Sequence, residues 1–267
     1  MGAISGDKMD INPSVSDDAT GNSDQSSNQL IDFDEALQVL KDGDIELITR
    51  MPYSSNATFL VQVDTKEQSV RGIYKPVEGE RPLWDFPSGL HRREIAAYEL
   101  SQQLGWNVVP PTIERVGPYG IGSVQLFIDA DFEQHHFTLV KDPRNHSSLQ
   151  KLCVLDLLAN NTDRKAGHCL LARSGSIFGI DHGLCFSSEF KLRTVIWDFA
   201  NQPISDALMH AVGQVSEGSV SGLRDWLEES EIEALIGRAQ WLRDHPFFPE
   251  DDGYRLSLIH ISEPTRP

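Results

Sequence analysis

The sequence predicts an α+β fold with two lobes, a small β-rich N-lobe over residues 30–128 and a mainly helical C-lobe over residues 129–255. Short strand-like apolar runs gather between residues 45 and 128, whereas helical spacing of apolar residues dominates beyond residue 149. The chain has 267 residues, of which 39% are hydrophobic. This length allows one large domain or two modest lobes, and the hydrophobic share allows a sizeable core.

Both ends of the chain are expected to lie outside this fold. Residues 1–29 are rich in Ser, Asp, Asn and Gly, which predicts a disordered tail of acidic and polar character. Residues 256–267 read LSLIHISEPTRP, which resembles the translation of an adapter used to prepare sequencing libraries. We therefore expect this segment to be a non-native tail that contributes nothing to the fold.

The chain is strongly acidic, with a formal net charge of −17. Nucleic acid and anionic lipid surfaces are poor partners for such a chain, because they are negatively charged as well. No apolar run reaches the roughly 18 residues that a membrane helix needs. Cys153, Cys169 and Cys185 form no pairing motif, which favours reduced thiols. The sequence thus predicts a cytoplasmic protein without a nucleic-acid partner or integral membrane association.

The N-lobe is expected to consist of strands and two helices. The elements are a helix over 31–40, strands over 45–51, 59–63 and 70–75, a helix over 91–104 and a strand over 123–128. The loop between the first two strands contains Ser54, Ser55 and Asn56, whose backbone N–H groups and short side chains can cradle phosphates. By itself, such a loop is more often a plain hairpin turn.

The C-lobe is expected to begin with a loop over 129–148. Its helices are predicted over 149–158, 205–212, 220–229 and 231–243, and short strands over 169–171 and 177–180. The two strands flank a Ser-Gly-Ser turn at Gly175, which is typical of a hairpin.

Two acidic side chains flank this hairpin, Asp163 before it and Asp181 after it. Closing the hairpin brings the Asp163 loop beside Asp181, with His168 close to both. Two carboxylates at one point suit a divalent cation beside a proton acceptor, and phosphoryl transfer needs that combination. The alternative is a surface loop with ordinary turn residues.

The spacing of these residues is also informative. Lys165 follows Asp163 at +2, His168 follows it at +5, and an Asp-His-Gly run begins at Asp181. Protein kinases have Asp, Lys at +2 and Asn at +5, followed by Asp-Phe-Gly. The Asp-Arg pair that ends at Arg164 and the Ile-Asp-x-Gly ending instead resemble the phosphatidylinositol 3-/4-kinase superfamily. The Asn-Thr-Asp-Arg run is most similar to its type II phosphatidylinositol 4-kinase branch, of which this chain looks like a bacterial-type member.

Three further motifs carry the same resemblance, which spans roughly residues 45–186. They are Gly-Ile-Tyr-Lys-Pro ending at Pro76, Arg-Glu-x-Ala-Ala-Tyr ending at Tyr98, and Gly-Trp-x-Val-Val-Pro-x-Thr ending at Thr112. The resemblance implies a two-lobed kinase-like fold and an ATP-dependent phosphotransferase. Each motif alone is weakly specific, whereas the set is fairly specific.

The resemblance also implies roles for single residues around the transferred phosphoryl group. Asp163 is expected to orient and deprotonate the acceptor hydroxyl, and Lys165 to neutralise the phosphoryl group. His168 and Asp181 are expected to hold Mg²⁺ or Mn²⁺. His168 departs from the pattern, which has Asn there, and carboxylate, carbonyl and water suit Mg²⁺ better than imidazole does.

The N-lobe residues are expected to bind the nucleotide. Lys75 would hold the α- and β-phosphates and would be fixed by Glu94, although Glu94 could equally serve to balance the helix dipole. The strand that contains Gln125, Leu126 and Phe127 would meet the adenine edge, with ATP between the lobes. The alternatives are a surface lysine and a buried strand without a ligand.

The sequence does not determine the acceptor, and it also allows two other functions. Because no basic patch or basic amphipathic helix is visible, we expect a hydroxyl acceptor on a protein or small molecule rather than an inositol lipid. His168 favours a second reading, a catalytically weak or inactive nucleotide-binding regulator. A third reading is a metal-dependent phosphoester hydrolase that uses Asp163, His168, Asp181 and His182.

Overall fold

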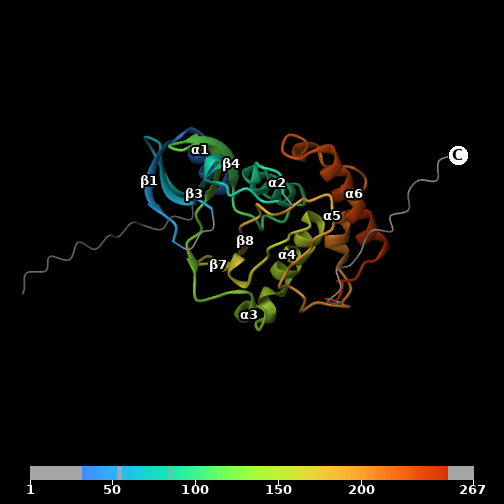
Figure 1. Ribbon diagram of the computed structural model, residues 1–267. Helices are drawn as coiled ribbons and strands as arrows, with labels where there is room; N and C mark the ends of the chain where they lie inside the picture. Colours follow the sequence, from blue (N-terminus) through green and yellow to red (C-terminus); the bar gives the residue numbers. More distant parts are fainter. Residues whose placement is uncertain (1–31, 53–55, 85, 252–267) are drawn as a thin grey trace, which may run out of the picture. The chain divides into compact units, whose positions relative to one another are not determined.

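An antiparallel five-stranded sheet forms the first part of the structure. The computed structural model describes residues 32–52, 56–84 and 86–251, so the predicted tails at 1–29 and 256–267 lie outside the described residues. The strands are β1 (Asp44–Arg50), β2 (Phe59–Asp64), β3 (Ser69–Pro76), β4 (Thr112–Gly117) and β5 (Gly120–Leu126), in the order β1-β2-β3-β5-β4. Figure 1 labels β1, β3 and β4 of this sheet. β3 therefore lies in the middle, paired with β2 and β5.

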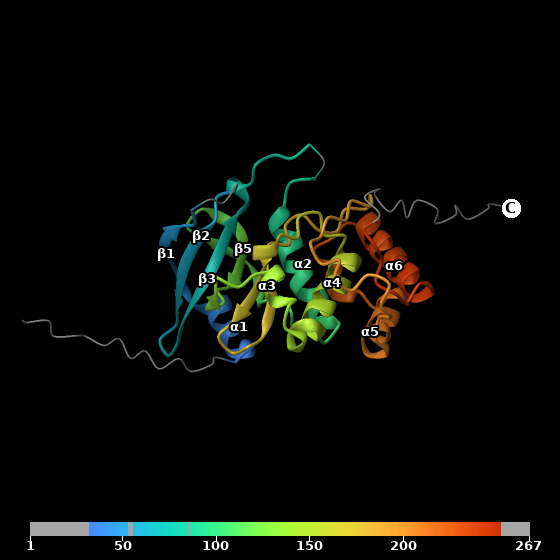
Figure 2. The same cartoon turned by 90° about the horizontal axis from the view of Figure 1, so that it is seen from below.

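Two helices pack against this sheet, α1 (Phe33–Asp42) and α2 (Leu90–Gln103). The side chain of Asp32 caps α1 by accepting a hydrogen bond from the backbone N–H of Asp34 at 3.2 Å. Helix α2 is buried on most sides, with Ile95 and Leu100 fully covered. Figure 2 shows why: the five-stranded sheet lies on one side of α2, and α4, α5 and α6 lie on the other.

The rest of the described chain is mainly helical, with a small second sheet. Its elements are β6 (Ala130–Asp131), α3 (His136–Leu139), α4 (His146–Ala159), β7 (Cys169–Ala172), β8 (Ile177–Gly179), α5 (Asp206–Ser216) and α6 (Glu229–Asp244). The described chain also contains four short 3₁₀ turns. The first, Val77–Gly79, follows β3, and the others are Pro143–Asn145, Ala166–His168 and Ser221–Leu223. The lobe boundary between residues 128 and 129 stays a prediction; the second sheet begins at Ala130.

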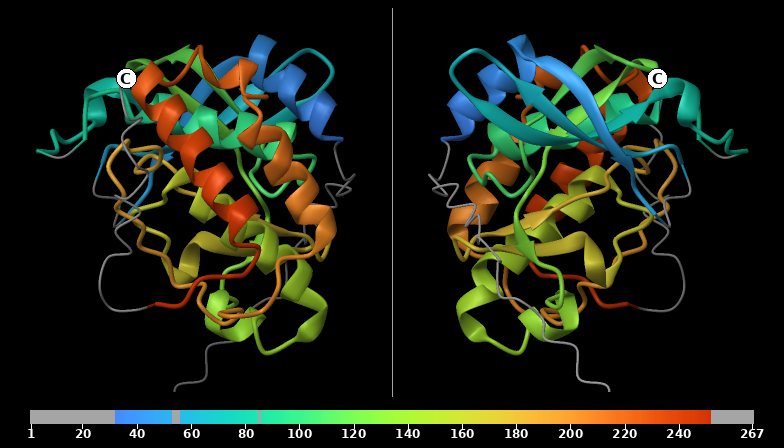
Figure 3. Two further views of the ribbon diagram at one scale, coloured as in Figure 1. Left: turned by 90° about the vertical axis from the view of Figure 1, so that its right-hand side faces the viewer. Right: turned by 90° about the vertical axis from the view of Figure 1, so that its left-hand side faces the viewer.

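Helix α4 is the centre of the core. Its apolar side chains point in all directions and belong to one buried cluster with side chains of α2, α5 and α6, so that Leu149, Leu152, Leu155 and Leu158 are fully buried. Each such leucine stabilises the fold by about 1.5–3 kcal/mol relative to exposure. Helices α5 and α6 lie side by side, as Figure 3 shows. The loop that follows α4 is therefore attached to the buried core of the described chain.

The structure differs from the sequence prediction at three places. Residues 129–148 are not a plain loop, because β6 pairs with β7 and one helical turn forms α3. The helix predicted over 220–229 is wrong: the segment forms a 3₁₀ turn, and Glu228 already caps α6. Strand β4 was not anticipated, since it lies at the sheet edge, has Glu114 and Arg115 at its centre and exposes Val116.

The described part of the chain contains no helix that combines the length and the apolar character needed to cross a bilayer.

Candidate active site

Lys75 lies near the end of β3 and contacts two carboxylates that come from distant parts of the chain. Its Nζ pairs with Oε1 of Glu94 on α2 and lies 2.8 Å from Oδ1 of Asp181. The ion pair predicted between Lys75 and Glu94 is present, and the contact with Asp181 joins it to the loop after β8. Burial alone would lower the pKa of Lys75, but Asp181 and Glu94 together hold it above its usual value.

Glu94 also contacts the loop that carries Asp181, the second partner of Lys75. Its second oxygen, Oε2, accepts a hydrogen bond from the backbone N–H of His182 at 2.9 Å. A Cβ on Gly183 would lie 3.3 Å from Oε1 of Glu94, tighter than most real contacts, which explains the glycine there. Glu94 is 3% exposed, so its charge is compensated by these contacts rather than by water.

Asp181 lies two residues beyond β8 and has a left-handed backbone with φ of 62°. Its side chain is 46% exposed, and its Oδ2 lies 3.4 Å from Nε2 of His168. The Lys75 ammonium group holds the pKa of Asp181 well below its usual range. Asp181 is therefore ionised at neutral pH, and burial lowers the pKa of His168, which keeps that ring neutral.

Asp163 lies on the loop after α4, and its carboxylate forms an ion pair with Lys165 at 2.7 Å. The backbone N–H of Asp163 donates to Oδ1 of Asn161 at 2.9 Å, which fixes the loop locally. The backbone N–H of Lys165 approaches Nδ1 of His168 at 3.4 Å. The same loop thus carries the Asp163–Lys165 pair and the ring that faces Asp181.

The predicted phosphate loop is described only in part, because Ser54 and Ser55 lie outside the described residues. The side-chain oxygen of Asn56 accepts a hydrogen bond from the backbone N–H of Arg81 at 3.1 Å. A Cβ on Gly79 would lie only 2.4 Å from that of Ala57, so glycine allows the two segments to meet. Asn56 is thus held by the segment that follows β3.

In the strand that is predicted to meet adenine, several hydrogen-bonding groups already have partners within the protein. The N–H of Leu126 donates to the carbonyl of Pro111 at 2.8 Å, and that of Phe127 donates to the carbonyl of Arg71 at 2.9 Å. The amide of Gln125 donates to Thr112 Oγ1 at 2.9 Å. The backbone N–H groups of residues 126 and 127 thus have protein partners, and the contact of this strand with adenine stays a prediction.

Apolar side chains gather where this strand meets the second sheet. Leu126 and Ile180 pack against a buried cluster formed by Ile128, Ala130, Leu170, Ala172 and Phe178. This cluster joins the end of β5 to the second sheet.

A buried polar group behind the site was not anticipated from the sequence. Asp156 and Arg164 are fully covered and form an ion pair at 2.8 Å. Arg164 also donates to Nε2 of the fully buried His182 ring at 2.7 Å. The sequence could have pointed to Asp156, because a carboxylate inside an otherwise apolar helix needs a buried partner.

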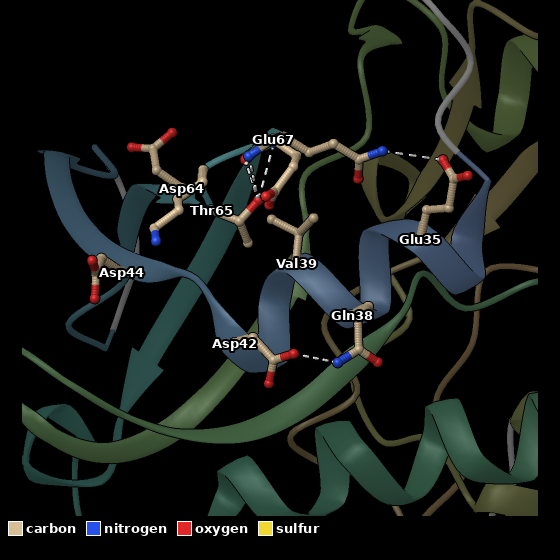
Figure 4. Close-up of a pocket in the computed structure, with 10 residues that line it drawn as sticks. Glu35, Gln38, Val39, Asp42, Asp44, Asp64, Thr65 and Glu67 are labelled. Atoms are coloured by element: carbon tan, nitrogen blue, oxygen red, sulfur yellow. Dashed lines mark hydrogen bonds between the residues drawn. The ribbon is translucent and has the colours of Figure 1, made fainter.

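A surface groove elsewhere is acidic and separate from these residues. It has a volume of about 690 Å³ and is lined by α1, the start of β1 and the turn between β2 and β3. Figure 4 shows the side chains of Glu35, Asp42, Asp44, Asp64 and Glu67 around it. Lys66 is the single cation among the residues that line this groove.

The chain is similar to kinases in sequence. A family model described as phosphatidylinositol 3- and 4-kinase matches residues 99–231, which include Asp163 and Asp181. Protein Rv2133c of Mycobacterium tuberculosis (strain ATCC 25618 / H37Rv) is 39% identical over 260 residues, covering 83% of this chain and 94% of its own length. Phosphatidylinositol 4-kinase gamma 4 of Oryza sativa subsp. japonica is 27% identical over 197 residues, covering 57% of this chain. This chain spans only 34% of the rice protein.

Solved kinase structures share the fold. The crystal structure of the Golgi casein kinase with Mn/ADP bound has a TM-score of 0.57 and 16% identity, covering 80% of this chain and 75% of its own. The structure of hydra Fam20 with sugar has a TM-score of 0.54 and 13% identity, covering 81% of this chain and 88% of its own. The prediction of a two-lobed kinase-like fold is confirmed. On these similarities of sequence and fold, the chain belongs to the phosphatidylinositol 3- and 4-kinase family, as a bacterial-type member.

Proposed function

We propose that this protein is an ATP-dependent phosphotransferase that moves the γ-phosphoryl group of ATP to a hydroxyl acceptor. The observation that supports this best is the position of Lys75, whose ammonium group contacts Glu94 and Asp181 together. Kinases use a lysine–glutamate pair to hold phosphates and an aspartate to hold the metal. Here one lysine connects both parts.

Each residue has a distinct task in this proposal. Lys75 binds the α- and β-phosphates and is oriented by Glu94. Asp163 orients the acceptor hydroxyl and takes its proton. Lys165, 2.7 Å from Asp163, neutralises charge that develops on the phosphoryl oxygens. Ser54, Ser55 and Asn56 cover the phosphates, and the strand with Gln125, Leu126 and Phe127 lies beside adenine.

The residues present fit a divalent cation that is shared with the nucleotide. Asp181 is half-exposed, and its Oδ2 faces Nε2 of His168, so both can hold one ion. The described residues contain no cluster of three or more His, Cys, Asp or Glu side chains suited to a metal. Mg²⁺ commonly binds one or two carboxylates together with substrate phosphates, which matches so small a set. When bound, Mg²⁺ or Mn²⁺ would neutralise the phosphate oxygens.

Binding and turnover test the proposal separately. ATP with Mg²⁺ or Mn²⁺ should raise the unfolding temperature, because a ligand of the native state stabilises it by about 2.7 kcal/mol at a hundredfold excess over Kd. An Asp181→Asn change should lower turnover by roughly 100- to 1,000-fold while the protein stays folded. Full activity in this variant would refute the role given to Asp181.

For the acceptor, we propose a protein or small-molecule hydroxyl. The net charge of −17 and the acidic groove beside α1 make an anionic membrane an unfavourable partner. Labelled ATP should therefore label soluble acceptors in a cell extract. Labelling of phosphatidylinositol vesicles alone would show that this choice is wrong.

His168 favours a second candidate, a nucleotide-binding regulator with little or no turnover. An imidazole in place of an amide suits Mg²⁺ less well. Under this alternative the wild type binds nucleotide and metal without transfer. A His168→Asn change should then produce Mg²⁺-supported transfer that the wild type lacks. Transfer by the wild type rejects this candidate.

A further inference from the structure

The separation of Asp163 from Asp181 is not set by the hairpin alone. Strands β7 and β8 pair at only three positions, from Cys169↔Gly179 to Leu171↔Ile177. The ladder ends at Gly179, before Asp181 is reached, and Asp163 lies outside both strands. Beyond the ladder, the N–H of Ile180 donates to the carbonyl of His168 at 3.1 Å and that of Thr162 to the carbonyl of Leu184 at 3.0 Å, and a side-chain interaction adds to these backbone contacts.

The side chain of Arg164 makes that interaction on the Asp181 side. Its Nη1 donates to the carbonyl of Ile180 at 2.9 Å and to that of His168 at 3.2 Å. Its Nη2 donates to Nε2 of His182 at 2.7 Å. One guanidinium group thus contacts the residues on both sides of Asp181 and the backbone of His168.

Asp156 holds the same guanidinium group and the Asp163 loop together. It accepts from Nε of Arg164 at 3.0 Å and from Nη2 at 2.8 Å. It also accepts from Nδ2 of Asn161 at 2.9 Å, and Oδ1 of Asn161 accepts from the N–H of Asp163 at 2.9 Å. Both members of the ion pair are 0% exposed, so solvent does not weaken the pair.

Gly179 leaves space for the guanidinium group of Arg164. A Cβ on Gly179 would lie 3.3 Å from both Nη1 and Nη2 of Arg164 and 2.7 Å from Cδ2 of Leu152. A methyl group at this position would therefore displace Arg164 or the leucine. Glycine at 179 keeps Arg164 in contact with both sides of Asp181.

We propose that Arg164, held by Asp156, is the positioning residue that fixes Asp163, His168 and Asp181 relative to one another. This rests on the phosphotransferase function proposed above. Arg164 touches neither nucleotide nor acceptor in this scheme; it acts through the backbone at 168, 180 and 182 and through Asp156. Its network also reaches the N-lobe helix, because the N–H of His182 donates to Glu94.

The test replaces the ion pair by an apolar pair, Asp156→Leu with Arg164→Met. A single change would leave one buried charge uncompensated, whereas apolar pairs of similar volume often preserve a fold. We expect the double variant to unfold cooperatively while kcat falls about 100-fold, the cost of a small displacement of reacting groups. Binding of Mn²⁺ in the presence of ADP, followed by electron paramagnetic resonance, should weaken at least about tenfold, as when a residue that supports a metal ligand is lost.

A second variant and a matched control complete the experiment. Gly179→Ala keeps both charges and should lower kcat and Mn²⁺ binding in the same direction. If the double variant does not fold, this variant tests the positioning role of Arg164 instead. The control is a second buried ion pair among the described residues, Arg93–Glu231, replaced by Arg93→Met with Glu231→Leu. It should leave kcat and Mn²⁺ binding within about threefold of the wild type, as expected for a pair outside the site.

The outcomes separate this proposal from the proposed function. A folded Asp156→Leu, Arg164→Met protein with unchanged kcat and Mn²⁺ binding overturns the positioning role, as does an equal loss in the control. If the wild type binds Mn²⁺ with ADP but transfers nothing, the phosphotransferase fails. The weakened Mn²⁺ binding of the variants then still supports Arg164. A wild type without binding and without transfer overturns both.

Discussion

At the scale of single residues, Lys75 shows what the sequence predicts and what it does not. The pairing of Lys75 with Glu94 could be predicted, because the order of strand, loop, strand and helix matches a known arrangement. The contact between Lys75 and Asp181 joins residues 106 positions apart, and only the folded chain brings them together. The roles of Asp163, Lys165 and His168 stay predictions that biochemistry must test.

A Lys75→Met change should lower kcat/KM by roughly 100- to 1,000-fold, because a donor to the phosphates is lost. It should also raise the pKa of Asp181, whose main stabilising cation disappears. Steady-state kinetics and an unfolding curve check this. Lys66→Met, in the acidic groove beside α1, is the control and should behave as the wild type. Equal losses in both variants would contradict the role of Lys75.

His182 makes stability depend on pH. Burial, reinforced by Arg164, holds the pKa of His182 well below 6.5, so the unfolded chain binds a proton that the folded chain does not. This contribution is therefore complete above about pH 6.5 and is lost as the pH falls below that value. Between pH 7.5 and 5, the free energy of unfolding should drop by about 1–2 kcal/mol on this account.

A His182→Gln variant tests this, since its side-chain oxygen can still accept from Arg164. Denaturant unfolding at several pH values should show a flatter pH dependence in the variant than in the wild type. Parallel curves for the two proteins would show that His182 is not responsible.

At the scale of elements, most strands and helices could be predicted from periodicity, and the exceptions have physical causes. Strand β3 alternates between buried and more exposed residues, whereas α4 is recognisable as a continuous apolar run whose side chains point in all directions. The spacing of Leu223 and Leu227 suggested a helix, but short turns bury both side chains equally well. Strand β6 exists only because β7 lies beside it, and no local pattern reveals such a partner.

Close contact between β3 and β5 supports the position of Lys75. A Cβ on Gly122 would lie 2.3 Å from the carbonyl oxygen of Lys75, so Gly122→Ala should push the strands apart. We expect a loss of about 1–3 kcal/mol in the free energy of unfolding, with weaker ATP binding. Chemical denaturation and an ATP titration measure the two effects.

Gly213→Ala is the matched control for this change. Gly213 lies within α5, and an added Cβ would meet nothing within 4 Å. Alanine should therefore stabilise the protein by about 0.5–1 kcal/mol, because it loses less backbone entropy in a helix. Stabilisation by Gly122→Ala as well would contradict the close contact between the strands.

At the scale of the whole molecule, a β-rich part provides Lys75 and a helical part provides Asp163 and Asp181. Fold class and family could be predicted, because the motifs occur in the order that the fold requires. The buried network of Asp156, Arg164 and His182 could not, since it depends on side-chain packing around α4. The acidic surface affects which acceptors the protein can bind, but it does not determine the fold.

The most direct test of the central claim is the transfer of label from γ-labelled ATP, with Mg²⁺ or Mn²⁺, by the wild type and by Asp163→Asn side by side. The wild type should label a hydroxyl acceptor in a cell extract. Asp163→Asn should do so roughly 100- to 10,000-fold more slowly, because the group that takes the acceptor's proton is gone, while ATP still raises its unfolding temperature. Equal rates in the two proteins, or no transfer by the wild type, would contradict the account.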